Sequence, residues 1–378
     1  EANPDSPTGR MLAHPLPHTG TPQRRVKLND PELKTLVFRG VHARNLQIDE
    51  ITVPLQRFTV VTGVSGSGKS TFCREVLFAN LSRRLKDAQA PLVGTDQLTG
   101  FENVGRVLEV DQTPIGKNSR SCPATYVGIM TAIRDLYAAT NEAQARGYDA
   151  SRFSFNKAVG ACPVCAGQGL RTVEMNFLPD VKVLCEACAG KRFNPETLEV
   201  LWRGKSIGDV LEMEIDEAVD FFASMPSIAY PLKLMQDVGL GYLTLGQPSP
   251  TLSGGEAQRL KLVTELAKVR TDGSFAARAP HTLYVLDEPT VGLHMTDVDR
   301  LSKVLSRLVD AGSTVVVIEH NLDIAADADW IIDLGPEGGA KGGKVVAQGS
   351  PKMIARKNTA TGIVLKAFLA EHKPVKSA

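Results

Sequence analysis

Residues 63–70 read GVSGSGKS and fit the phosphate-binding pattern G-x-x-x-x-G-K-[ST]. The preceding FTVVT predicts a strand and the following STFCREVLFANLSRRL predicts a helix, which is the context that this pattern requires. In such a loop, backbone N–H groups and the helix N-terminus bind phosphate oxygens. We therefore expect Lys69 to contact the β- and γ-phosphates of ATP and Ser70 to bind Mg²⁺. The predicted nucleotide-binding residues of this loop are Gly63, Ser65, Gly66, Gly68, Lys69, Ser70 and Thr71.

An acidic pair ends a second apolar run, TLYVLDEPT at 282–290. Asp287, at the end of the predicted strand, suits a direct or water-mediated hold on Mg²⁺ and so belongs to the nucleotide site. Glu288 is the predicted catalytic base, because a carboxylate there can orient and polarise the attacking water. His320 ends the next apolar run, TVVVIEH. A single histidine at a strand end is more often structural, but this position after the acidic strand favours a contact with the γ-phosphate.

The short stretch LSGGE at 252–256 opens an amphipathic helix, LSGGEAQRLKLVTELAK. Ser253 and Glu256 have the spacing of a capping box, and capping alone is one reading of this stretch. Two glycines in a first helical turn lower helix propensity, however. They also leave N–H groups free to hold a phosphate, so we assign Ser253, Gly254 and Gly255 to nucleotide binding.

Four of the six cysteines form two Cys-x-x-Cys pairs, separated by the stretch 166–184. This spacing is typical of zinc sites, whereas a disulfide framework would not cluster in this way in so large a chain. The four predicted zinc ligands are Cys162, Cys165, Cys185 and Cys188. A closed Cys₄ site is structural and would fold a loop too small to have its own core. Reduced thiols of this kind indicate a cytoplasmic protein.

Basic residues are in excess around the cysteines, since residues 117–205 contain twelve Lys or Arg and eight Asp or Glu. We expect this region to bind DNA through its backbone and shape, with little readout of sequence. Phe153, Phe155 and Phe177 lie among these charges and could stack on bases, although RFSF fits a half-buried core strand better. The candidate DNA contacts are Lys117, Arg120, Arg146, Arg152, Lys157, Arg171, Lys182, Lys191 and Arg192.

The elements that must position these residues alternate between strand and helix, which predicts an α/β fold with a parallel sheet. We expect an irregular linker over 1–36 and an ATP-binding core in two parts, 37–120 and 251–352. A mostly helical insertion over 121–250 would carry the zinc module at 160–193, and 353–378 would form a tail. No stretch is apolar enough to span a membrane, and the N-terminus has no signal-peptide pattern. The net charge of +1 excludes a globally basic, histone-like protein.

The phosphate loop, LSGGE, the acidic strand and the terminal histidine resemble, in this order, the ABC-type ATPase family. Gln112, 43 residues after Lys69 in VDQTPIG, matches the family's glutamine-loop position and is a further predicted catalytic residue. In that family LSGG closes over nucleotide that the phosphate loop of an opposing module holds. The resemblance therefore implies a partner, either a second ABC module or a second copy of the chain.

Further stretches resemble the C-terminal half of the UvrA family: SRSCPATYVGI, RGYDASRFSFN, EMNFLPDV, GKRFNPETLEV, LGQPSPTLSGGEAQRLKL and ADWIIDLGPEGG. The resemblance implies an ATP hydrolase without nuclease activity that recognises damaged DNA in nucleotide excision repair. It also implies that the whole protein loads a UvrB-type partner, mainly through an N-terminal half that this chain lacks. The chain also has no initiator Met, so we expect a fragment.

Three alternatives stay open on the sequence. KVRTDGSFAARAPHT looks longer than is usual in the family, and KAVGACPVC has Ala158 and Ala161 at unexpected positions, which leaves room for a paralogue in resistance to DNA-binding drugs. The ATPase of a membrane transporter is a second alternative, but the long zinc-bearing insertion argues against it. A zinc-stabilised DNA-binding module without hydrolysis is the third, and Glu288 argues against that.

Overall fold

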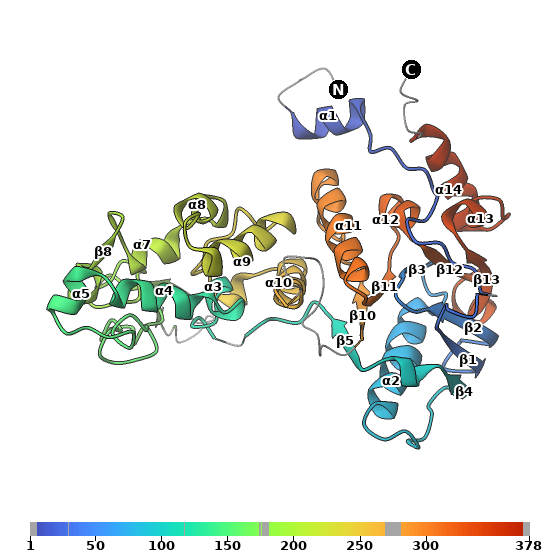
Figure 1. Ribbon diagram of the computed structural model, residues 1–378, viewed down its shortest axis with the longest axis horizontal. Helices are drawn as coiled ribbons and strands as arrows, with labels where there is room; N and C mark the ends of the chain where they lie inside the picture. The colour runs from blue at the N-terminus through green and yellow to red at the C-terminus, as the bar shows by residue number, and fades with distance from the viewer. Residues whose placement is uncertain are drawn as a thin grey trace. The chain divides into compact units, whose positions relative to one another are not determined.

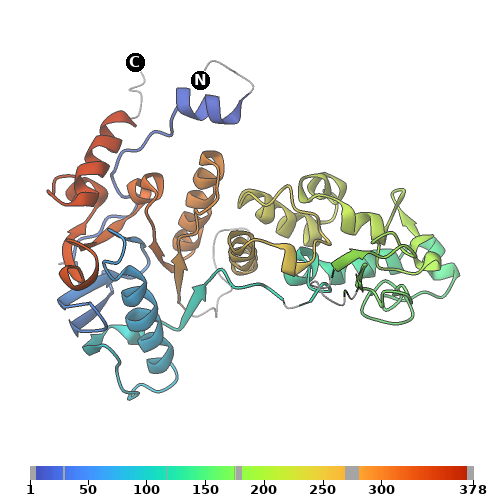
Figure 2. The ribbon, with the colours of Figure 1, turned by 180° about the vertical axis from the view of Figure 1, so that it is seen from behind.

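The computed structural model describes residues 6–28, 30–116, 118–173, 175, 181–268 and 281–372. The chain divides into two compact units, seen from opposite sides in Figure 1 and Figure 2. Unit 1 combines Glu1–Asp111 with Lys268–Ala378, and unit 2 is the continuous stretch Gln112–Ala267.

A six-stranded sheet forms the centre of unit 1, in the order β13-β12-β3-β11-β10-β5. Its strands are β3 (Phe58–Gly63), β5 (Arg106–Val110), β10 (Thr282–Asp287), β11 (Thr314–Ile318), β12 (Trp330–Gly335) and β13 (Lys344–Gly349). All neighbours are parallel except β12 and β13, which are antiparallel. The parallel carboxyl ends of β3, β10 and β11 therefore lie at one edge, where the phosphate loop, the acidic pair and His320 follow.

Helices cover the central sheet, which explains why its inner strands are continuous apolar runs rather than alternating ones. The π-helical segment η1 and α2 pack against β5, and α11 packs against β3 and β11. Helices α12 and α14 also pack against β3. The helical segments of unit 1 besides α1 are η1 (Thr71–Phe78), α2 (Ala79–Arg84), η2 (Phe101–Asn103), α11 (Met295–Asp310), α12 (Leu322–Asp327), η4 (Gly339–Lys341), α13 (Pro351–Ile354) and α14 (Ala360–Glu371).

A second, antiparallel sheet in unit 1 has the order β2-β1-β4. Its strands are β1 (Thr35–Val41), β2 (Ile48–Pro54) and β4 (Thr95–Thr99). One hydrophobic core joins this sheet to the helix after the phosphate loop, with Phe38 and Phe72 fully buried edge to face at 5.7 Å. Burying two aromatic rings in this way anchors the helix that must hold the loop.

The N-terminal segment, expected to be an irregular linker, contains the helix α1 (Pro7–Ala13), and its described residues 14–28 and 30–34 have no further helix or strand. It lies against the rest of unit 1 through buried polar contacts. The ring nitrogens of His18 lie 2.8 Å from Asp327 and 2.9 Å from Asp323. Arg24 donates to the fully buried carboxylate of Asp329, which also accepts the N–H of Phe58. The segment is therefore tied to the strand that leads into the phosphate loop.

Among the described residues of unit 2, helices are the main regular elements, joined by turns and loops, and two short antiparallel strand pairs are present, β6-β7 and β8-β9. The helical segments are α3 (Pro123–Tyr126), α4 (Ile129–Ala138), α5 (Asn141–Ala145), α6 (Pro195–Leu198), α7 (Ile207–Glu212), α8 (Ile215–Phe221), α9 (Pro226–Asp237), η3 (Ser249–Thr251) and α10 (Gly254–Leu266). The strands are β6 (Leu170–Val173), β7 (Val181–Leu184), β8 (Leu201–Trp202) and β9 (Lys205–Ser206).

The α/β character with a parallel sheet is confirmed. The strand expected at RFSF is wrong, because residues 151–155 form turns; Phe153 and Phe155 are nevertheless buried in the core, as expected. Phe177 and most of KVRTDGSFAARAPHT lie outside the described residues. None of the helices that the structure describes combines the length and apolar character needed to cross a bilayer.

Candidate nucleotide site, zinc site and nucleic-acid surface

The phosphate loop connects the end of β3 at Gly63 to the start of η1 at Thr71. Gly63 has φ +135°, and a Cβ there would lie 2.0 Å from the carbonyl oxygen of Leu334. Gly68 has φ +100°, and a Cβ there would lie 2.4 Å from the side chain of Leu46. Both positions therefore require glycine, as the phosphate-binding pattern predicts.

Lys69 is only 6% exposed, and its Nζ donates to the carbonyl oxygens of Gly63 at 2.9 Å and Val64 at 3.0 Å. Burial lowers the pKa of Lys69 below its usual 10.5, and the carboxylates of Glu288 and Asp287 act in the opposite direction. The hydroxyl oxygen of Ser67 is buried without a hydrogen-bond partner among the described residues. A buried ammonium and an unsatisfied hydroxyl in one glycine loop fit a bound phosphate group.

Asn45 binds the backbone of the phosphate loop, and no sequence pattern predicted this contact. Its Nδ2 donates to the carbonyl oxygens of Gly66 and Gly339, both at 3.1 Å. The N–H of Gly339 also donates to Gly66 at 3.0 Å. The phosphate loop is thus fastened to the segment after β12, a contact between residues about 270 positions apart in the chain.

The acidic pair lies at the end of β10 as predicted, with Asp287 next to Ile318 of β11 in the sheet register. Glu288 follows with φ +44°, an uncommon conformation for a residue with a side chain. Its N–H donates to the carbonyl oxygen of Ile318 at 2.9 Å. Nε2 of His320 lies 3.7 Å from Oε1 of Glu288, and both side chains are about half exposed. Unit 1 therefore brings the predicted base and the predicted phosphate contact together beside the phosphate loop.

Ser253 and Glu256 form the capping box that their spacing predicts, at the start of α10. The hydroxyl of Ser253 accepts the N–H of Glu256 at 3.3 Å, and the Glu256 carboxylate accepts the N–H of Ser253 at 2.7 Å. A Cβ on Gly254 would lie 3.1 Å from the Gln112 side chain. Gln112, Ser253, Gly254 and Gly255 all belong to unit 2, which places Gln112 next to the LSGG turn.

The four predicted zinc ligands are buried together, with their Sγ atoms within 4.8 Å of one another. The distance is 4.0 Å from Cys162 to Cys185 and 3.7 Å from Cys165 to Cys188. A tetrahedral site with Zn–S bonds of about 2.3 Å needs sulfur atoms roughly 3.8 Å apart, so the donor set fits zinc. Burial raises the pKa of Cys165 and of Cys188, and that of Cys188 reaches about 12. Zinc binding would then release protons from these thiols.

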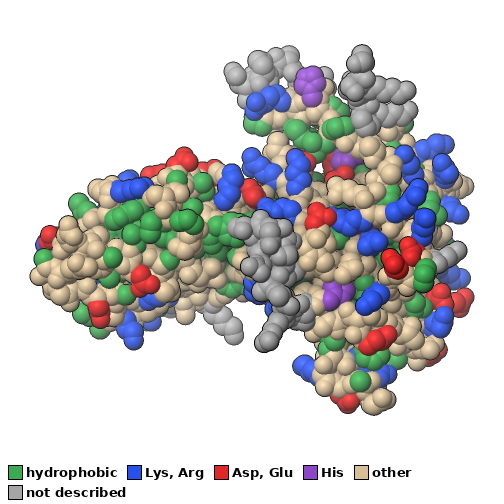
Figure 3. Space-filling model, in the orientation of Figure 1, with side chains coloured by type: hydrophobic (Ala, Val, Ile, Leu, Met, Phe, Trp, Pro, Cys, Tyr) green, Lys and Arg blue, Asp and Glu red, His purple; other side chains and the backbone are tan. Residues whose placement is uncertain are grey.

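The candidate DNA contacts differ in whether their side chains are exposed or already bound to other protein groups. Lys157, Arg171 and Lys182 are exposed, and the last two lie on the β6-β7 hairpin. Their neighbours on this hairpin include the exposed apolar residues Val173 and Val181. On the face shown in Figure 3, the Lys and Arg side chains of unit 2 are scattered, and hydrophobic side chains gather over α8 and α9. Lys117 lies outside the described residues.

Four other candidates already have protein partners. Arg146 pairs with Glu142 and Glu199 at 2.5 and 2.6 Å. Lys191 pairs with Asp209 at 2.6 Å. The remaining two are Arg152, which donates to Thr197 at 2.9 Å, and Arg120, which donates to the carbonyl oxygen of Ala166 at 2.8 Å. These side chains hold unit 2 together, so they are weaker candidates for DNA phosphates than the three exposed ones.

Arg192 does not fit a DNA contact, because its side chain is buried. It is 4% exposed, and its guanidinium donates to the carbonyl oxygens of Ser119 at 2.7 Å and Gly246 at 2.6 Å. Its own carbonyl oxygen accepts the N–H of the zinc ligand Cys162 at 2.8 Å. Arg192 therefore connects the cysteine module to the segment that leads into LSGGE.

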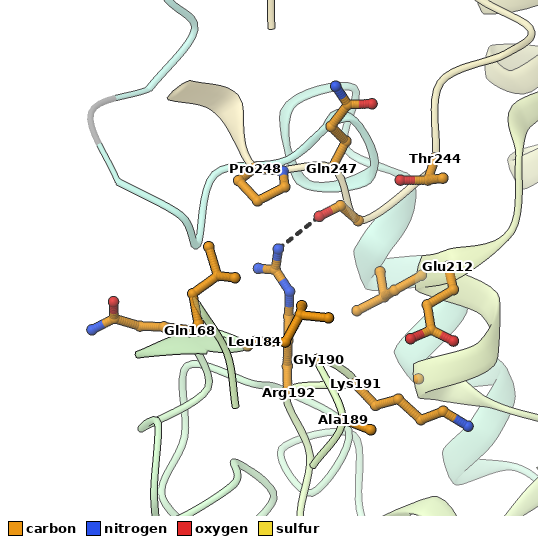
Figure 4. A pocket seen from close by; sticks show the side chains of 15 residues that line it. Gln168, Leu184, Ala189, Gly190, Lys191, Arg192, Glu212, Thr244, Gln247 and Pro248 are labelled. Atoms are coloured by element: carbon orange, nitrogen blue, oxygen red, sulfur yellow. Dashed lines mark hydrogen bonds between the residues drawn. The ribbon is translucent and has the colours of Figure 1, made fainter. Parts of the chain in front are cut away.

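Figure 4 shows this connection from within a cavity of about 430 Å³. Arg192 extends between the Ala189–Gly190 turn of the cysteine module and the loop that carries Gln247 and Pro248. Apolar side chains, among them Leu184, line much of the remaining wall.

Comparison with known proteins gives a consistent result over nearly the whole chain. It is 54% identical to UvrABC system protein A of Thermus thermophilus over 368 residues, which are 97% of this chain and 37% of that protein. It is 50% identical to UvrABC system protein A of Bacillus subtilis over 376 residues, 98% of this chain and 38% of the relative. The chain is homologous to UvrA. No protein-family model matches it.

A solved structure agrees with the UvrA relationship. The crystal structure of UvrA2 from Deinococcus radiodurans matches with a TM-score of 0.82 and 45% identity, covering 97% of this chain and 43% of that one. The predicted resemblance to UvrA is thereby confirmed, and because 97% of the chain is covered, it extends through both units. The chain spans less than half the length of each of these UvrA relatives.

Proposed function

We propose that this chain is the C-terminal ABC-type ATPase half of a UvrA protein and takes part in ATP-dependent recognition of damaged DNA in nucleotide excision repair. One observation carries the proposal: the chain is 54% identical to a UvrABC system protein A over 97% of its length. The position of Lys69, Glu288 and His320 at one edge of the central sheet of unit 1 agrees with it. The proposed activity is ATP hydrolysis, without nuclease activity of its own.

The residues of unit 1 have distinct proposed roles. The phosphate loop binds the phosphates of ATP, with Lys69 on the β- and γ-phosphates. Bound Mg²⁺ would neutralise phosphate charge, and the Ser70 hydroxyl and the Asp287 carboxylate are the residues that would hold it. Glu288 orients the attacking water and accepts its proton, and His320, whose Nε2 lies 3.7 Å from the Glu288 carboxylate, contacts the γ-phosphate.

The proposed signature-domain insertion of this ATPase, residues 121–250, makes up most of unit 2, which also contains Gln112 and the LSGG turn. Gln112 and the LSGG turn would act on nucleotide bound by an opposing ABC module, either a second module of the same protein or a second copy. We keep the proposed boundaries of 121–250 for the insertion and 160–193 for the zinc module, and assign a structural role to zinc. The exposed residues Lys157, Arg171 and Lys182 are the proposed contacts with DNA phosphates. A UvrB-type partner would bind mainly through a part of the protein outside this chain.

Glu288→Gln tests the hydrolytic role, because the amide keeps the size of the side chain and removes the base. We expect ATP binding to persist and turnover to fall by about 100-fold or more. Asp299→Asn, which changes a carboxylate of α11 that pairs with Lys303 at 2.6 Å, serves as the matched control. Unchanged hydrolysis by Glu288→Gln would remove Glu288 from this role.

DNA binding is tested separately by comparing intact and lesion-bearing duplex, with and without ATP. Binding should weaken steeply as salt rises, since phosphate contacts release counterions. A flat salt response would contradict the proposed phosphate contacts. Equal affinity for intact and damaged duplex under all nucleotide conditions would contradict damage recognition.

A further inference from the structure

Glu319 is a buried carboxylate that precedes His320 and contacts Thr290, two residues after Glu288, and the proposed mechanism has not used it. It is 2% exposed and accepts four hydrogen bonds. One oxygen accepts the N–H of Thr290 at 2.9 Å and its hydroxyl at 2.6 Å. The other accepts the N–H groups of His320 at 2.8 Å and Asn321 at 3.1 Å.

The sheet order explains why one side chain can reach both loops. Strand β11 lies between β3 and β10, and Glu319 is the first residue after β11. Its N–H donates to the carbonyl oxygen of Val61 in β3 at 3.2 Å. Its side chain extends the other way, to the turn that follows β10. Glu319 therefore lies between the strand of the phosphate loop and the turn of the acidic pair.

The turn that Glu319 holds is conformationally strained. Glu288 has φ +44°, and such a backbone conformation persists only where its surroundings impose it. On one side the N–H of Glu288 is bonded to the carbonyl oxygen of Ile318. On the other side Thr290, two residues later, is held twice by Glu319. These contacts leave the turn little freedom to relax and move the Glu288 carboxylate.

We propose that Glu319 is a positioning residue for ATP hydrolysis, which sets the Glu288 carboxylate and the His320 imidazole at their working separation. This rests on the proposed function, because it assigns Glu319 a part in that reaction. Glu319 acts through Thr290 and through the backbone of His320, and it does not itself touch nucleotide. It should therefore affect turnover much more than nucleotide affinity.

The role is tested by one substitution of Glu319 and one of its partner Thr290. Glu319→Gln keeps the shape but turns an amide NH₂ toward N–H donors on one side, so up to two of the four hydrogen bonds are lost. Thr290→Val removes only the hydroxyl contact, and Thr290→Ser restores it as the matched control. A hydrogen bond of this kind corresponds to about a fivefold change in rate.

The experiment measures kcat and KM for ATP, and the Kd of a non-hydrolysable ATP analogue, for the three variants and the unaltered chain. We expect kcat to fall about 10- to 100-fold for Glu319→Gln and about fivefold for Thr290→Val, with recovery in Thr290→Ser. KM and analogue affinity should stay within about threefold in every variant. A Glu319→Gln/Thr290→Val double variant, measured in the same way, should lose less kcat than the product of the two single losses, since the two side chains contact each other.

The possible outcomes separate the two proposals. If Glu319→Gln folds poorly, Thr290→Val and Thr290→Ser still decide the matter, and equal kcat in these two would overturn the role. A loss of analogue affinity as large as the loss of kcat would show general damage to the site and would also overturn it. If the unaltered chain binds the analogue but turns over no ATP, the proposed hydrolysis itself fails, and the role of Glu319 fails with it.

Discussion

Protonated His18 should stabilise unit 1, and this stabilisation should disappear in alkaline solution. The imidazole is only 4% exposed, and its two nitrogens lie 2.9 Å from Asp323 and 2.8 Å from Asp327. Burial alone lowers the pKa of His18, but the hydrogen bonds and charges of the two carboxylates outweigh it and raise the pKa from 6.5 to about 9. We therefore expect His18→Gln to destabilise the chain in a pH-dependent way.

The size of the effect follows from the difference between the folded and unfolded pKa values. A rise from 6.5 to about 9 corresponds to about 3 kcal/mol of unfolding free energy. The side chains of Asp323 and Asp327 are 24% and 33% exposed, so screening by water should reduce this to about 1–2 kcal/mol. The stabilisation by protonated His18 is complete below pH 6.5 and is lost as the pH rises through about 9. The reason is that His18 keeps its proton to a higher pH in the folded state than in the unfolded state.

Urea unfolding at several values between about pH 6 and about pH 9.5 measures this contribution. The free-energy difference between the unaltered chain and His18→Gln should be largest near pH 6 and should shrink toward zero above about pH 9. His14→Gln, which changes an exposed histidine of the same segment, should show no such trend. A difference for His18→Gln that stays constant with pH would refute the charge argument, even if the variant is less stable.

Three more predictions concern the other sites. Metal analysis should find about one zinc per chain, and Cys185→Ser should lose it and lower the melting temperature. Arg192→Met should cost about 2–4 kcal/mol in urea unfolding, because two buried carbonyl oxygens lose their donor, whereas Arg171→Met should leave stability unchanged and weaken DNA binding in a titration. Gly63→Ala should abolish binding of an ATP analogue, measured by calorimetry, because the added Cβ would lie 2.0 Å from a backbone oxygen.

Local sequence patterns predicted the features that depend on local structure. The strand and helix flanking GVSGSGKS and the capping box of Ser253 and Glu256 need only neighbouring residues, and both are present. The close approach of the four cysteines could likewise be predicted, because zinc geometry dictates it.

Contacts between residues far apart in the chain could not be predicted in this way. Asn45 reaches Gly339, and nothing in the sequence near Asn45 distinguishes it from any other loop asparagine. Arg192 was a candidate DNA contact because it lies in the basic region 117–205, but the fold turns its side chain inward to two backbone oxygens. Charge counts identify a basic region, whereas only the packed structure shows which cations are free.

The sheet order of unit 1 has a consequence for how the chain folds during synthesis. Strands β3 and β5 precede unit 2, whereas β10, β11, β12 and β13 follow it. In the sheet β3 lies between β11 and β12, and β5 lies beside β10, so β3 and β5 have no sheet partner until the ribosome has passed unit 2. Unit 2 is continuous and can fold in this interval. Until then β3, the strand that carries the phosphate loop, has both edges unpaired, so we expect this step to be slow and nascent chains to be prone to aggregation.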